Sequence, residues 1–96
     1  MGILEWNQII DLADRKANLQ TKSGVSFIVV RTTEKTVIIQ ETSGNQYSLL
    51  RKNLEKAVYK INQGLLLNGP KDYREHVADD RPAYAWAILK KLGYIK

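Results

Sequence analysis

Apolar residues recur with a helical period at the start of the chain. Between about Ile3 and Lys16 they are spaced i, i+3, i+4, i+7 and i+11, as on one face of an α-helix; they are Trp6, Ile9, Ile10, Ala13 and Ala17. The next segment, NLQTKSG at 18–24, interrupts this pattern with polar residues and a glycine. We therefore predict one helix, followed by a loop or a short edge strand.

The following segment is rich in β-branched residues, which are typical of strands. VSFIVVRT at 25–32 and TVIIQE at 36–41 are separated only by the polar residues TEK, so we predict an antiparallel hairpin. TSGN at 42–45 predicts a second turn, and QYSLL at 46–50 predicts a third strand. Because the apolar runs FIVV and VII are continuous, we expect both sheet faces to be covered, one by the first helix and one by later elements.

The segment SLLRKNLEKAVYKINQG at 48–64 has the clearest helical pattern. Its apolar positions follow the spacing of a core-facing stripe and are Leu50, Leu54, Ala57, Val58 and Ile61. Gly64 is a suitable residue to end this helix.

A last helix is expected to begin near DDRPAY at 79–84. Asp79 and Asp80 suit the positive end of the helix dipole, and Pro82 suits the first turn. Its apolar stripe consists of Ala85, Ile88, Leu89 and Leu92. The segment DYREHVADD at 72–80, between the two predicted helices, is expected to form a helical turn.

These elements predict a small single α+β domain over residues 1–96. Its expected order is an N-terminal helix, a three-stranded antiparallel sheet, and two or three C-terminal helices. The 96-residue length, 44 % hydrophobic and 26 % charged content are those of an ordinary globular domain. The three strands and following helix, residues 26–64, are similar in outline to small sheet-type DNA readers, although they share no motif with them.

Positive charge is concentrated in the middle of the chain. The net charge is +5, yet residues 15–60 alone carry nine basic and three acidic residues, or +6. Such an excess favours polyanionic partners.

Within that segment, Lys52, Lys56 and Lys60 recur at i, i+4 and i+8, on the helix side opposite the apolar stripe. They span roughly 12 Å at about 1.5 Å per residue, enough to meet successive phosphates. The predicted nucleic-acid-binding residues are Arg51, Lys52, Lys56, Lys60, Arg31 and Lys35. Tyr47 and Tyr59 could add base stacking if they are exposed. The alternative interpretation is a solvated helix face on which Arg51 pairs with Glu55.

We therefore expect a non-enzymatic module that binds DNA or RNA, such as an accessory domain of a larger protein. The alternative is a protein-interaction or oligomerisation domain that uses an aromatic C-terminal helix. Tyr84, Trp86 and Tyr94 would then contact a protein partner or a second copy of the chain, provided that they are exposed.

No pattern in the chain indicates catalysis, a cofactor or a metal. Acidic residues cluster around His76; they are Asp72, Glu75, Asp79 and Asp80. Asp72, Glu75, His76 and Asp79 have helical spacing, but there is no second histidine and no cysteine to complete a zinc site. Arg74 and Arg81 are expected to pair with these carboxylates instead. No serine lies in a nucleophile elbow, and no glycines form a phosphate-binding loop.

The longest apolar runs, such as FIVV and LLL, are far shorter than the roughly 20 residues of a membrane span. The N-terminal segment has no basic flank and does not resemble a signal peptide. We therefore expect a cytoplasmic domain without a membrane partner.

Overall fold

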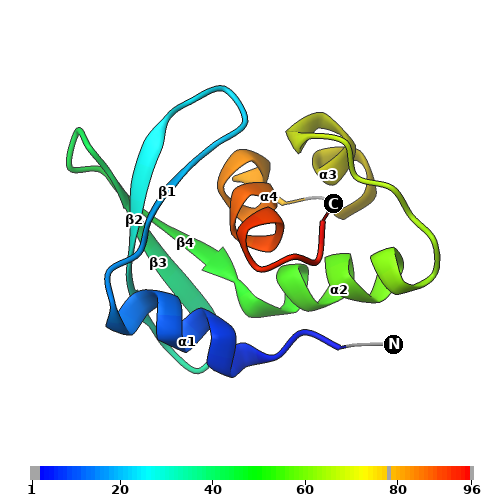
Figure 1. Cartoon of the computed structure of the whole chain (residues 1–96), viewed down its shortest axis with the longest axis horizontal. Helices are drawn as coiled ribbons and strands as arrows, with labels where there is room; N and C mark the ends of the chain where they lie inside the picture. The colour runs from blue at the N-terminus through cyan, green and yellow to red at the C-terminus, as the bar shows by residue number, and fades with distance from the viewer. Residues whose placement is uncertain (1–2, 78, 96) are drawn as a thin grey trace.

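The computed structural model describes residues 3–77 and 79–95, and Figure 1 shows the order of its elements. The chain forms α1 (Trp6–Asp14), β1 (Asn18–Gln20), β2 (Ser26–Thr32), β3 (Thr36–Glu41), β4 (Gln46–Leu50), α2 (Arg51–Asn62), α3 (Pro70–Val77) and α4 (Pro82–Lys91). The predicted α+β domain is confirmed, with three C-terminal helices. The sheet has four antiparallel strands in the order β1-β2-β3-β4 rather than the three expected.

The fourth strand is the edge strand β1, which the sequence left open as a loop or a strand. It pairs with β2 in the register Leu19↔Phe27. Leu19 is buried, whereas its neighbours Asn18 and Gln20 are exposed. A single inward-facing leucine in a polar segment is too short a pattern to indicate a strand by itself.

One face of the sheet carries the core. The cross-strand neighbours Val29 and Ile39, and likewise Val37 and Leu49, are fully buried. Figure 1 shows α2, α3 and α4 together on one side of the sheet. The buried residues of α1 belong to the same core cluster as these strand residues; they are Ile9, Leu12 and Ala13.

The other face of the sheet is largely open, so the expectation that both faces are covered is wrong. Ile28 lies in a row with Gln40 and Gln46, and it is exposed. The neighbouring row on this open face, which we call the outer row, consists of Arg31, Ile38 and Ser48. In this row Ile38 is buried, whereas Ser48 is exposed. The apolar run in β2 is continuous partly because the register shifts between Val29 and Arg31, which interrupts the alternation of inward and outward residues.

β4 leads directly into α2 without a loop. Leu50 ends the strand with extended backbone, and the Arg51 N–H donates a hydrogen bond of 2.8 Å to the Lys35 carbonyl across the β3–β4 ladder. Leu54, Ala57 and Val58 are buried, as predicted. Leu50 is 42 % exposed, because its place at the strand end removes it from the helical stripe. The junction therefore holds the start of α2 beside the tip of the β2–β3 hairpin.

The later helices largely follow the predicted positions. Gly64 has φ +101°, and its N–H bonds the Ile61 carbonyl at the end of α2. Pro82 is the first residue of α4, but the first turn of α4 contains no acidic residue. Asp79 instead accepts a hydrogen bond of 2.9 Å from the Arg81 N–H in the loop before the helix.

Candidate nucleic-acid interface

A hollow of about 450 Å³ lies where β4 becomes α2. It is lined by Lys35, Leu50, Arg51, Lys52 and Glu55. Lys35 comes from the hairpin tip and the other residues from the strand–helix junction, so the direct β4–α2 connection brings Lys35 together with Arg51 and Lys52. We call this space the junction hollow.

Arg51 is held in place by three parts of the structure. Its Nε lies 3.3 Å from the Glu55 carboxylate, and its Nη1 donates to the Glu34 carbonyl at 3.2 Å. Its guanidinium also lies 4.8 Å from the centre of the Trp6 ring. The pairing of Arg51 with Glu55, which the alternative interpretation of a solvated helix face predicts, is thus confirmed. Arg51 joins α1, the hairpin tip and α2, and it offsets the charge of Glu55.

A second hollow of about 410 Å³ continues along α2. Its lining residues come from the N-terminal segment and from the outer side of α2; they are Ile3, Leu4, Lys52, Glu55, Lys56, Tyr59 and Asn62. Tyr59 is 63 % exposed and Ile3 is 82 % exposed. Lys52 and Glu55 line both spaces, so the two hollows adjoin. We call the second space the helix hollow.

Lys35, Lys52 and Lys56 are the free cations of this region. All three are exposed, and the described part of the chain contains only two ion pairs, Asp11–Arg15 and Glu55–Arg51. The three lysines are therefore available to an anionic ligand. Together with Tyr59 they form what we call the α2 basic surface.

Two of the predicted binding residues lie outside both hollows. Lys60 donates a hydrogen bond of 2.7 Å to the His76 carbonyl at the end of α3, so its side chain is turned toward that helix. Arg31 belongs to the outer row of the sheet with Ile38. The structure thus assembles Lys35, Arg51, Lys52 and Lys56, but not Lys60 or Arg31.

Tyr47, the other predicted stacking residue, is half-buried and already covered. The Arg81 guanidinium lies 4.0 Å from the centre of its ring, and Tyr84 stacks against it with centroids 5.8 Å apart. Arg81 thus stacks on an aromatic ring and forms no ion pair among the described residues. These contacts join residues 34 or more positions apart, and no local pattern could have indicated them.

Tyr84 also donates a hydrogen bond to the carboxylate of Glu41. This bond lowers the pKa of Glu41, because it stabilises the charged carboxylate. Burial, together with the same bond, raises the pKa of Tyr84 to about 12. The pair therefore ties α4 to the end of β3.

The residues of the predicted aromatic partner interface are buried or half-buried. Trp86 is 8 % exposed, and its indole N–H donates to the Leu67 carbonyl at 3.0 Å. The Tyr94 hydroxyl accepts from the Glu5 N–H and donates to Gln8 at 2.6 Å, which ties the C-terminal segment to the start of α1. Tyr84, Trp86 and Tyr94 therefore hold the fold together and do not form an exposed aromatic patch.

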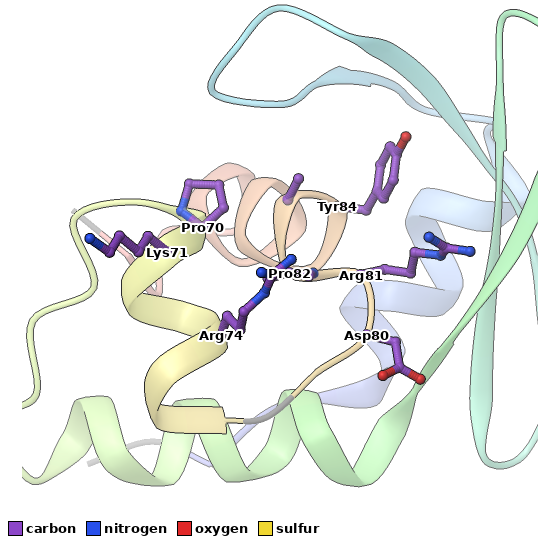
Figure 2. Close-up of a pocket in the computed structure, with 8 residues that line it drawn as sticks. Pro70, Lys71, Arg74, Asp80, Arg81, Pro82 and Tyr84 are labelled. Carbon is purple, nitrogen blue, oxygen red and sulfur yellow. The ribbon is translucent and has the colours of Figure 1, made fainter.

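Another basic hollow, of about 420 Å³, lies between α3 and the start of α4 (Figure 2). Its cations are Lys71, Arg74 and Arg81, and Asp80 lies beside them. Figure 2 shows Lys71 and Arg81 pointing in opposite directions, the latter toward the sheet. Since these cations diverge, this hollow is less suited to a single anionic ligand than the α2 basic surface.

Two of the acidic residues around His76, Asp72 and Asp79, bond the local backbone. Asp72 accepts a hydrogen bond of 3.0 Å from the Asn68 N–H. Within residues 3–77 and 79–95, no three His, Asp or Glu side chains gather closely enough to hold a metal ion. Asp79 is buried, and its second carboxylate oxygen and the nearby Tyr73 hydroxyl have no hydrogen-bond partner within residues 3–77 and 79–95.

Comparison with known proteins gives no match, whether with family models, curated proteins or solved structures. Among the described helices, none has the length and apolar character needed to cross a membrane. Function is therefore inferred from the geometry of the described residues.

Proposed function

We propose that this domain binds nucleic acid, DNA or RNA, on the α2 basic surface, without catalysing a reaction. The observation that carries the proposal is the grouping of Lys35, Lys52 and Lys56 around two adjoining hollows, each lysine without an acidic partner among the described residues. Lys35 reaches this group only because β4 runs directly into α2.

Charge balance within the surface supports the same function. Glu55 is the one carboxylate in the lining of the two hollows, and Arg51 lies against it at 3.3 Å. The three lysines therefore act as an uncompensated positive group. The net charge of +5 adds a long-range attraction for polyanions.

The expected affinity depends on salt in a calculable way. Three phosphate contacts give a slope of log K against log salt of roughly −2 for single strands and −3 for B-DNA. Binding would therefore weaken about 20- to 40-fold between 50 and 200 mM salt.

The test is fluorescence anisotropy with labelled DNA and RNA, single- and double-stranded, at 50, 100 and 200 mM salt. We expect binding that weakens with salt and is lost in Lys52→Glu/Lys56→Glu. The matched control is Lys71→Glu/Lys91→Glu, which changes the net charge equally at exposed residues outside both hollows. Equal loss in both variants would indicate attraction by net charge, or binding at the other basic hollow that Lys71 lines, and would contradict the proposed surface.

A further inference from the structure

We propose that the α2 basic surface takes single-stranded rather than double-stranded nucleic acid, with one unpaired base in the helix hollow against the Tyr59 ring. This inference rests on the proposed function and specifies its ligand.

Tyr59 is placed as a stacking residue. Its side chain is 63 % exposed, and in the described part of the chain it has no hydrogen bond, aromatic contact or cation over its ring. The other tyrosines are half-buried or fully buried. One exposed tyrosine is unremarkable alone, but this one lines a hollow together with two free lysines.

The apolar residues around Tyr59 fit a base better than a phosphate. Six large hydrophobic side chains are exposed among the described residues, and Ile3, Leu50 and Tyr59 are the three that line the two hollows. Glu55 also lines both hollows and disfavours an isolated anion inside them. A nucleotide strand satisfies both features, because its bases can enter the hollow while its phosphates stay at the rim.

The spacing along α2 places cations beside the ring. Lys52, Lys56 and Tyr59 follow one another at i, i+4 and i+7, so they share one side of the helix. The lysine ammonium groups can then contact phosphates on the strand whose base stacks on Tyr59. This combination of a basic track and an aromatic platform is how proteins bind unpaired strands without reading their sequence.

A duplex has no exposed base face that could stack on the Tyr59 ring. Its base faces are stacked on one another, so Tyr59 would gain nothing beyond the electrostatic attraction that any polyanion provides. The difference between the two ligands therefore depends on Tyr59, whereas the lysines serve both.

The test compares a labelled 15-mer of dT, the same length of mixed-sequence duplex and vesicles containing anionic phosphatidylserine, at 50 mM salt. We expect the single strand to bind more tightly than the duplex or the vesicles. Tyr59→Ala should weaken single-strand binding about 5- to 150-fold and leave duplex binding unchanged. Tyr59→Phe, which keeps the ring, should bind like the original protein.

The possible failures are distinguishable. Equal, salt-sensitive binding of strand and duplex, unaffected by Tyr59→Ala, would leave the proposed function intact and overturn this inference. No binding of either nucleic acid at 50 mM salt would overturn both, and preferential binding of vesicles would identify a lipid surface instead. Because Tyr59 is exposed, Tyr59→Ala is expected to fold, which thermal melting by circular dichroism would verify.

Discussion

The guanidinium group of Arg51 lies 4.8 Å from the centre of the Trp6 ring, and this contact links the first helix to the start of α2. The same side chain bonds Glu55 on α2 and the carbonyl of Glu34 at the hairpin tip. Three segments that are distant in sequence are thus held around the junction hollow. Arg51 therefore positions the cations of the α2 basic surface.

We expect Arg51→Ala to lower both stability and nucleic-acid affinity. The cation–π contact and the exposed ion pair together are worth about 1–2 kcal/mol in the free energy of unfolding. Affinity should fall because Glu55 loses its partner and the hairpin tip that carries Lys35 is released. Urea denaturation and anisotropy measure the two effects. Unchanged stability would show that the Trp6 and Glu34 contacts contribute nothing in solution.

Arg51→Lys is the informative companion variant. Lysine keeps the charge but has no planar group to bond Glu55 and Glu34 while stacking on Trp6. If Arg51 acts by positioning, this variant should resemble Arg51→Ala. If only its charge matters, the variant should bind nucleic acid like the original protein.

Glu55→Gln should tighten the binding of nucleic acid. The substitution removes the one carboxylate that lines both hollows and frees the charge of Arg51. A surface charge interaction of about 0.2–1 kcal/mol corresponds to a gain of up to about fivefold. Anisotropy at 50 mM salt measures it, with Glu75→Gln on α3 as the control that makes the same charge change elsewhere. Weaker binding by Glu55→Gln would mean that Glu55 itself contacts the ligand.

The bond between Tyr84 and Glu41 predicts a pH dependence of stability. The pKa of Glu41 is lowered in the folded protein, so this contribution is present above its ordinary value of about 4.5 and is lost as the pH falls further. The pKa of Tyr84 is raised from 10 to about 12, so its contribution is complete below pH 10 and is lost as the pH rises through 12.

Tyr84→Phe should therefore lower the melting temperature at neutral pH. The variant should also lose less of its melting temperature than the original protein when the pH falls below 4.5 or rises above 10. Melting curves between pH 3 and 12 measure the effect, and Tyr59→Phe is a control that removes an exposed hydroxyl. Identical pH profiles for Tyr84→Phe and the original protein would exclude the Tyr84–Glu41 bond as their source.

Trp86→Ala should destabilise the fold severely. The residue is 8 % exposed and its indole N–H bonds the Leu67 carbonyl, so the change leaves a cavity and a lost hydrogen bond. Large-to-small changes of this kind cost about 3–5 kcal/mol, a large part of the about 5–15 kcal/mol that stabilises a typical domain. Chemical denaturation should show this loss. Full stability in Trp86→Ala would contradict the role of the Trp86 side chain in holding the fold together.

Local patterns predicted most of the helices and strands, because each depends on residues a few positions apart. The buried residues Leu54, Ala57 and Val58 follow directly from helical spacing, and the β2–β3 hairpin follows from its two β-branched runs. Leu50 was predicted both as the last residue of the third strand and as part of the buried helical stripe. The strand assignment is confirmed, and the burial is wrong because the backbone of Leu50 belongs to the strand.

The binding surface was only partly predictable, because local spacing shows on which side of a helix a residue lies but not which distant groups it contacts. Spacing identified Lys52 and Lys56 on one side of α2, but it also included Lys60, which the distant His76 carbonyl turns toward α3. Whether a side chain is free depends on partners far away in sequence. The exposure of Tyr59 and the inward orientation of Trp86 could likewise be known only from the packed structure.

Tyr73 provides a last prediction, because its buried hydroxyl has no hydrogen-bond partner in the described part of the chain and lies near Asp79, one oxygen of which is likewise unpaired there. Burial and the charge of Asp79 raise the pKa of Tyr73 well above its ordinary value, so the hydroxyl stays protonated and gains no bond in return. An unsatisfied buried polar group costs about 1–3 kcal/mol. Tyr73→Phe keeps the buried ring and removes only the unsatisfied hydroxyl, so it should raise the free energy of unfolding by about 1 kcal/mol. Urea denaturation compares it with Tyr84→Phe, which removes a bonded hydroxyl and should have the opposite sign. A loss of stability in Tyr73→Phe would contradict the prediction and show that the Tyr73 hydroxyl makes a stabilising hydrogen bond in solution.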